Sequence, residues 1–170
     1  MSNNDFNYFV DQFDDMRVLR YMLPGFESLT LQQKKFIFFL SQAALSGRDI
    51  LWDQNFRFNI LIRKTIEAIL ENFIGDKDSN EYKLFLVYVK RVFFANGIHH
   101  HYSTDKLKPG FSEVYFEKLI RSVDHKLLPL SNGEDLDNFV SVLKSVLFDE
   151  TLYARKVELK ADVDIIAGSA

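Results

Sequence analysis

The segment Phe36–Leu40, with the sequence FIFFL, is apolar on every side when it is wound into a helix. Thr30 and Gln33 form a capping box just before it, so a helix should begin near Leu31 and continue to about Ser46. A helix that packs on a core from one side needs only an apolar stripe. A helix that is apolar all round has to be covered on all sides, so we expect that the chain oligomerises or is truncated from a larger protein.

The amino-acid composition supports the same expectation. The chain has 17 Phe and 7 Tyr but only 3 Pro and 7 Gly among its 170 residues. Each aromatic side chain buries on the order of 150–250 Å² in a core. The length permits a single domain over residues 1–170. Such a domain would have more apolar surface than its own core can bury.

Charge and cysteine content exclude several classes of protein. The net charge of −3, with 21 Lys and Arg spread along the chain, provides no basic footprint for a nucleic-acid partner. The absence of Cys excludes disulfides and thiolate metal sites. No uncharged apolar stretch approaches the roughly 20 residues that a membrane span needs, and the first residues do not resemble a secretory signal. We therefore expect a cytoplasmic protein without a membrane partner.

Hydrophobic periodicity predicts a mainly α fold with short extended segments. Apolar residues recur at intervals of three and four residues, and Ser131 with Glu134 forms a second capping box. Extended segments are expected near Val18–Leu23, before the turn signal Pro24-Gly25, and near Val163–Ala167. Besides the helix from Leu31, helices are expected over residues 5–14, 48–55, 56–73, 81–95, 112–123 and 131–147.

The loop that follows the helix expected to end at Ala95 is the best candidate for a functional site. It contains three of the four histidines, and loops of this kind expose side chains and backbone groups to ligands. If the loop is extended, His99 and His101 point to one side and His100 to the other. Three interpretations stay open here, namely a metal site, histidines that bond only backbone or solvent, and a loop that contacts a substrate without metal. The candidate substrate-binding residues are Asn96, His99, His100, His101, Tyr102, Ser103 and Asp105.

The residue types needed for catalysis are not found together. Two imidazoles could share a zinc, but a zinc site needs three or four protein ligands, and His125 and Asp105 are candidates only through their nearness in sequence. Asp49 and Asp53 lie one helical turn apart, which is compatible with a carboxylate pair for acid–base catalysis. Arg48 and Arg57 lie nearby and favour structural ion pairs instead. We therefore predict no catalytic residue and no metal ligand in this chain.

Three stretches resemble one enzyme family. They are Val18–Gln33 (VLRYMLPGFESLTLQQ), Leu40–Ile50 (LSQAALSGRDI) and Asn96–Ser103 (NGIHHHYS). Together they resemble the N-terminal region of the bacterial, Bacteroides-like dipeptidyl peptidase III enzymes, over roughly residues 10–170. These are zinc metallopeptidases that release dipeptides from the N-termini of peptides.

The resemblance implies a place within a larger, two-lobed enzyme. Family members hold zinc in an upper lobe on an H-E-x-x-G-H motif, and their N-terminal region belongs to the lower lobe, beside the cleft in which an extended peptide lies. This chain has no such motif. The resemblance thus implies a helical segment that lines the peptide cleft, is inactive alone, and has as partners the peptide substrate and the remaining lobes of the enzyme, or a second copy of itself. The loop from Asn96 to Lys106 corresponds to the family's loop beside the primed end of the cleft.

Two alternatives come from other functional classes. The first is a stand-alone helical interaction module that uses its aromatic surface to bind a partner protein without catalysis. The second is a small metalloenzyme built on the histidine loop, which the His99–His101 triplet permits and no other residue pattern supports.

Overall fold

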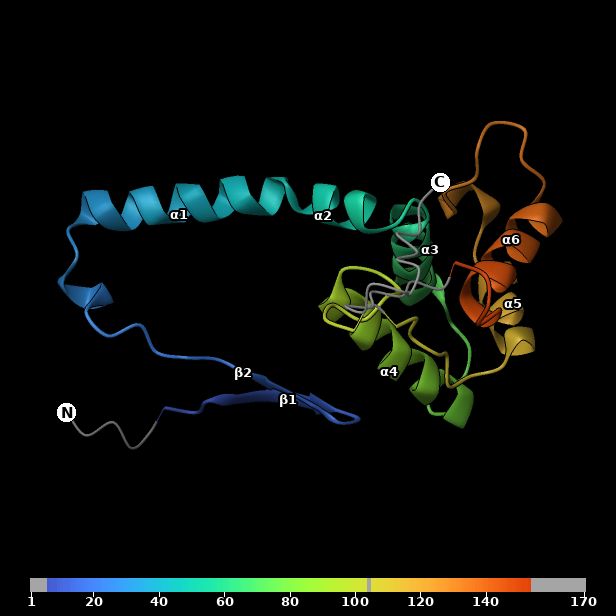
Figure 1. The fold of residues 1–170 in the computed structure, drawn as a ribbon, viewed down its shortest axis with the longest axis horizontal. Helices are drawn as coiled ribbons and strands as arrows, with labels where there is room; N and C mark the ends of the chain where they lie inside the picture. Colours follow the sequence, from blue (N-terminus) through green and yellow to red (C-terminus); the bar gives the residue numbers. More distant parts are fainter. Residues whose placement is uncertain (1–5, 104, 154–170) are drawn as a thin grey trace, which may run out of the picture. The chain divides into compact units, whose positions relative to one another are not determined.

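The computed structural model describes residues 6–103 and 105–153, and it confirms a mainly α fold. Figure 1 follows the elements along the chain. The strands are β1 (Phe9–Phe13) and β2 (Met16–Leu19), and the helices are α1 (Leu31–Ser46), α2 (Arg48–Asn55), α3 (Asn59–Asn72), α4 (Asn80–Ala95), α5 (Glu113–Arg121) and α6 (Leu136–Phe148). Short 3₁₀ turns cover Phe26–Ser28 and His125–Leu127. The strand expected at Val163–Ala167 lies outside the described residues.

The chain groups into two compact units that divide between Arg48 and Asp49. The first unit contains the two strands and α1, and the second contains most of α2 and all of α3 to α6. The expectation of one domain over residues 1–170 stays a prediction. None of the helices in the described ranges has the length and apolarity that crossing a lipid bilayer requires.

The first unit begins with an antiparallel hairpin in place of the helix expected over residues 5–14. Phe13 pairs with Met16, and Phe9 pairs with Leu19. Asp14 turns the chain with a left-handed φ of 51°, a conformation that Asp tolerates better than most residues. The helix prediction was wrong. Over so short a stretch, the spacing of apolar residues does not reveal whether a second strand is available to pair with it. The extended segment expected near Val18–Leu23 is partly realised, since β2 ends at Leu19.

Helix α1 has the bounds that its capping signal predicts. The Thr30 side chain accepts a hydrogen bond from the Gln33 amide, and the Gln33 side chain accepts one from the Thr30 amide. No residue of α1 is buried, and Phe36, Phe38 and Phe39 are each more than half exposed. The helix predicted to need cover on all sides therefore has its aromatic side chains at the surface.

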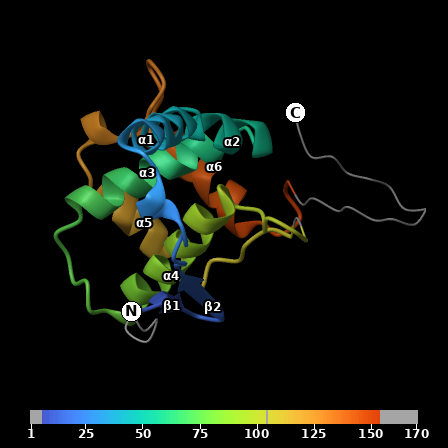
Figure 2. The ribbon, with the colours of Figure 1, turned by 90° about the vertical axis from the view of Figure 1, so that its left-hand side faces the viewer.

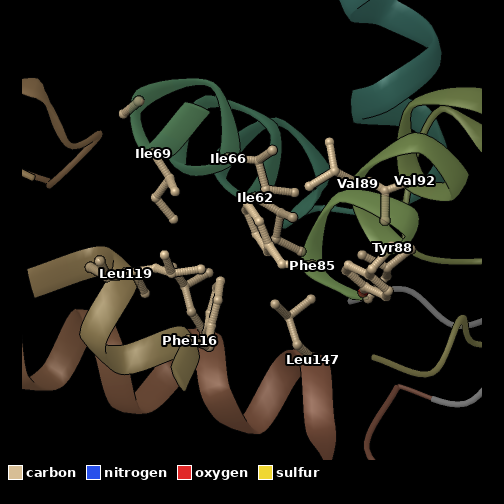
Figure 3. Close-up of a cluster of buried hydrophobic side chains, with 14 of the residues drawn as sticks. Ile62, Ile66, Ile69, Phe85, Tyr88, Val89, Val92, Phe116, Leu119 and Leu147 are labelled. Carbon is tan, nitrogen blue, oxygen red and sulfur yellow. The ribbon is translucent and has the colours of Figure 1, made fainter. Parts of the chain in front are cut away.

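The second unit has a continuous apolar core between α3, α4, α5 and α6, and these helices lie around one another in Figure 2. In Figure 3, Ile66 and Ile69 of α3 lie opposite Phe116 and Leu119 of α5, and Phe85 of α4 lies between the helices. The core residues recur at intervals of three and four along each helix, so each helix buries a single stripe.

Two helix starts differ from the prediction. Helix α3 begins at Asn59, because Phe56, Phe58 and the turn between them precede it. Helix α6 begins at Leu136, and its cap is Asp135, which accepts a hydrogen bond from the Asn138 amide. The expected capping residues Ser131 and Glu134 do bond to each other, but they close a separate turn before the helix.

Candidate functional site

The histidine loop is fixed to the core at its first residues by a buried asparagine. Helix α4 ends at Asn96, which has a left-handed φ of 54°. The Asn59 side chain, fully buried at the start of α3, accepts a hydrogen bond from the Ile98 amide at 3.2 Å. Its amide nitrogen donates to the carbonyl oxygens of Trp52 at 3.2 Å and Asn96 at 3.5 Å. Asn59 thus joins the end of α2, the start of α3 and the end of α4 at the base of the loop.

The loop folds back on itself after this anchor. His99 and Lys106 form an antiparallel bridge, and the Leu107 amide donates to the Ile98 carbonyl at 2.8 Å. The His100 amide donates to the Asp105 carbonyl at 2.7 Å. These backbone hydrogen bonds join the two ends of the loop, so the residues around Tyr102 form its tip.

The three histidines have different environments, and the extended geometry expected for them is not found. His99 is buried, its ring lies edge-on to Phe56 at a centroid distance of 5.1 Å, and its Nε2 lies 2.9 Å from the Tyr153 carbonyl oxygen. A carbonyl oxygen can only accept, so Nε2 of His99 has the proton. His101 lies against its neighbour His100, at a ring distance of 4.6 Å, because the chain turns at residues 101–103.

The tip of the loop presents an exposed group of rings. His101 lies 5.1 Å from the Phe94 ring and 4.3 Å from the Tyr102 ring, and Tyr102 is 84% exposed. The Nδ1 atom of His100 accepts hydrogen bonds from the amides of Tyr102 and Ser103, both at 3.2 Å. Neutral His100 therefore has its proton on Nε2, which is a donor.

A pocket of about 210 Å³ lies at the base of the loop. Side-chain amides and imidazoles supply most of its polar lining, and the lining contains no carboxylate. It is lined by Asn55, Asn59, Ala95, Asn96, Gly97, His99, His100 and His101. These groups donate and accept hydrogen bonds, which suits a polar ligand such as a peptide backbone.

The predicted site residues divide between this pocket and the tip. Asn96 and the three histidines line the pocket, whereas Tyr102 and Ser103 lie exposed at the tip. The Asp105 side chain is exposed, and its amide donates to the Ser103 hydroxyl at 3.3 Å. The structure thus brings four of the seven candidates around one space.

The segment after α6 lies against the loop at His99 and Lys106. The Lys106 ammonium donates to the carbonyl oxygens of Asp149 at 2.5 Å and Leu152 at 3.1 Å. Burial lowers the pKa of Lys106, although Asp149 and Glu150 act in the opposite direction. Hydrogen bonds from the hydroxyl and amide of Thr151 lower the pKa of Asp149. Lys106 is thus held as a hydrogen-bond donor to main-chain carbonyl groups.

Metal-ligating side chains do not converge in the described ranges. Over residues 6–103 and 105–153, no group of three or more His, Asp or Glu side chains is arranged to hold one metal ion. His125 lies exposed in a 3₁₀ turn. The described residues therefore do not fit the zinc site that the family resemblance implies.

One acid of α2, Asp49, forms an ion pair with a residue of α3. Asp49 lies 2.8 Å from the Arg63 guanidinium of α3, and Arg63 also lies over the Trp52 ring. Arg57 donates a hydrogen bond to the Tyr153 hydroxyl at 2.9 Å. Asp49 thus forms a structural ion pair with Arg63.

Three residues of this region are missing from the sequence prediction. Asn59, Lys106 and Tyr153 hold the loop in place, and each does so through a contact with a distant part of the chain. A local pattern contains no signal for such contacts. The sequence offers one clue, the Asn96-Gly97 pair. A glycine at this point suggests that another group packs closely against the backbone, but it does not identify that group as Asn59.

Comparison with models of protein families gives no match for this sequence. Comparison with curated proteins gives no match either. The resemblance to dipeptidyl peptidase III enzymes therefore rests on the three stretches quoted above.

Proposed function

We propose that this chain is the N-terminal, peptide-lining segment of a dipeptidyl peptidase III-like zinc exopeptidase. The observation that carries the proposal is the position of the resembling stretch Asn96–Ser103, which is a surface loop whose histidines line a polar pocket. In this proposal the loop binds the main chain of a peptide, and the zinc that cleaves the peptide belongs to the rest of a cytoplasmic enzyme.

The chemistry of the loop suits a peptide main chain. Recognition of an extended peptide by its backbone needs donors for carbonyl oxygens and acceptors for amides. The Nε2–H of His100 is a donor, and the side chains of Asn55 and Asn96 supply both kinds of group at the pocket. The ring of Tyr102, largely exposed at the tip, adds apolar surface for a substrate side chain.

Peptide binding by the loop can be tested with tetra-alanine as the probe. Titration followed by amide chemical shifts should move the signals of residues 96–103 first. The double variant Tyr102→Ala with Ser103→Ala alters only exposed side chains and should weaken binding at least about fivefold. Tyr21→Ala is the matched control, since Tyr21 is an exposed tyrosine of the other unit. Shifts confined to other residues, or equal binding by all three proteins, would contradict the proposal.

Catalysis provides a second test of the same proposal. The chain alone, supplied with zinc, should release no dipeptide from a dipeptidyl arylamide and should retain no stoichiometric zinc after dialysis. One tightly held zinc per chain, or hydrolysis by the metal-free protein, would refute the assignment of bond cleavage to another part of the enzyme.

A second function, an interaction module, is favoured by α1 alone. This helix has large apolar residues on all sides and no buried residue. Apolar patches of this kind mark protein interfaces. If α1 is the functional surface, replacing Phe36 and Phe39 by Asp should abolish association in light scattering, whereas the Tyr102→Ala and Ser103→Ala double variant should leave association unchanged.

A further inference from the structure

The five residues after α6 are bound to the histidine loop through their backbone carbonyl groups. We call this segment, Asp149–Tyr153, the strap. Lys106 donates to the first and fourth carbonyl oxygens of the strap, and His99 donates to the fifth. Three carbonyl oxygens of one short segment are therefore held by two side chains of the loop that we propose as a peptide site.

The contacts between loop and strap use the chemistry that peptide binding requires. An ammonium group and an imidazole N–H that bind carbonyl oxygens recognise a main chain without regard to its side chains. His99 also lines the pocket at the base of the loop. His99 thus belongs both to the candidate ligand site and to the attachment of the strap. Binding of a ligand at the pocket should therefore affect the strap, and release of the strap should affect ligand binding.

The strap combines backbone strain with exposed contacts. Tyr153 has a φ of 57°, a left-handed conformation that is uncommon for a bulky residue. Leu152 is 38% exposed, and the ion pair between Glu150 and Lys108 lies largely in solvent, where such pairs contribute little. Segments of this kind open locally without unfolding of the core.

Other contacts hold the strap against the second unit. The Tyr153 ring lies 5.2 Å from the Phe56 ring and 5.6 Å from the Phe58 ring, and the Tyr153 hydroxyl accepts a hydrogen bond from Arg57. Lys106 makes its two bonds from a half-buried position, where hydrogen bonds from a charged group are stronger than at an open surface.

We propose that the strap is a releasable element that competes in cis with a peptide main chain for the donors of His99 and Lys106. Opening of the strap frees both donors to bind a ligand, and closure occupies them with the carbonyl oxygens of the strap. The identity of the competitor rests on the proposed function, whereas the opening of the strap does not.

Hydrogen exchange tests the opening of the strap. In the wild-type chain, the amides of Thr151 and Leu152 should exchange at least about a hundredfold faster than the most protected amides of α3 and α4. Lys106→Met should speed exchange of these two amides and of the Leu107 amide by about tenfold more. Lys108→Met is the matched control, since it removes an exposed ion pair from the same strap, and it should change exchange by less than about twofold.

The outcomes of this test are distinct. Protection of the strap equal to that of the core helices would overturn the proposal, because the strap would then open only on global unfolding. Equal effects of Lys106→Met and Lys108→Met would also overturn it. Fluorescence of Trp52, the only tryptophan, checks that both variants keep the fold of the second unit.

Tetra-alanine tests the competition. Tyr153→Phe removes the hydrogen bond from Arg57 and should bind tetra-alanine about two- to fivefold more tightly than wild type. Saturating peptide should in turn speed the exchange of the strap amides in the wild-type chain. The control is Tyr115→Phe, which removes a hydroxyl that lies 3.4 Å from the Ser79 hydroxyl, outside the strap.

The tetra-alanine experiment also distinguishes failure of the competition by the strap from failure of the proposed peptide site. Binding of equal strength to Tyr153→Phe and wild type, with no change in strap exchange, overturns the competition and leaves the peptide site in place. Tetra-alanine that binds none of the three proteins overturns the competition and the proposed function together.

Discussion

Replacement of Gly97 by Ala introduces a methyl group at the most crowded point of the loop. An ideal Cβ on Gly97 would lie 2.2 Å from Nδ2 of Asn59 and 2.7 Å from its Cγ. Both distances are far below any van der Waals contact. Gly97 also has a φ of +151°, which residues with a side chain rarely adopt. The variant therefore has to distort the backbone and displace a buried amide at the same time.

The cost follows from these two effects. A residue held in a sparsely populated backbone region loses about 1–3 kcal/mol. Displacement of Asn59 breaks its bonds to the Ile98 amide and the Trp52 carbonyl, and each buried group left without a partner costs about 1–3 kcal/mol. The lower ends of these ranges sum to about 3 kcal/mol, so Gly97→Ala should lower the free energy of unfolding by at least about 3 kcal/mol, a large part of the roughly 5–15 kcal/mol of a typical domain.

Urea unfolding followed by Trp52 fluorescence measures this loss close to its source, because the Trp52 carbonyl accepts a hydrogen bond from Asn59. Gly110→Ala is the matched control. A Cβ there would lie 3.5 Å from Leu84, an ordinary contact, so the change should stay within about 1 kcal/mol. In an Asn59→Ala background, Gly97→Ala should cost only the backbone part, since the atoms that it strikes are gone.

The double-variant comparison decides whether the reasoning holds. If Gly97→Ala costs the same with and without the Asn59 side chain, the overlap is not the cause of the loss. If it costs less than about 1 kcal/mol in the wild-type background, the close approach of α3 and the loop does not exist in solution.

Two further predictions concern single side chains of the second unit. The Tyr88 hydroxyl is buried without a hydrogen-bond partner among the described residues, and burial raises its pKa. Tyr88→Phe should therefore leave the free energy of unfolding unchanged or raise it by about 1 kcal/mol. A clear loss of stability in thermal unfolding would indicate that the hydroxyl is hydrogen-bonded. Hydrogen bonds from Lys144 and then Arg121 lower the pKa of Glu117, so its contribution is present above the ordinary value of 4.5 and is lost as the pH falls through the lowered value. Urea midpoints should accordingly decline less in Glu117→Gln than in wild type as the pH drops below about 4.5, and parallel declines would refute this.

Local signals determined how well the helices could be predicted. The bounds of α1 follow from one capping box, and the end of α4 follows from a left-handed Asn96. Where two caps compete, the sequence does not decide between them. Ser131 with Glu134 and Asp135 are both good starts for α6, and the structure uses the second, since Gly133 turns the chain with a φ of 78° between them.

Contacts between distant residues account for what the sequence could not reveal. The pairing of β1 with β2 depends on register, which a helical spacing of aromatic residues obscures. The site shows the same limit, because the sequence identified the histidine loop but not the groups that hold it. Asn59 lies 39 residues before its partner Ile98, and Tyr153 lies 54 residues after His99.

The three consecutive histidines are not equivalent, and this bears on how the loop could function. His99 is 7% exposed and bonded to the strap, so its removal disturbs the scaffold as well as any ligand. His101 is exposed beside Tyr102 and can be altered without loss of the core. His100 stands between these cases, because its Nδ1 orders the tip while its Nε2–H stays a donor. A ligand at the pocket would thus contact one imidazole fixed by the strap, one adaptable imidazole and one that orders the tip of the loop.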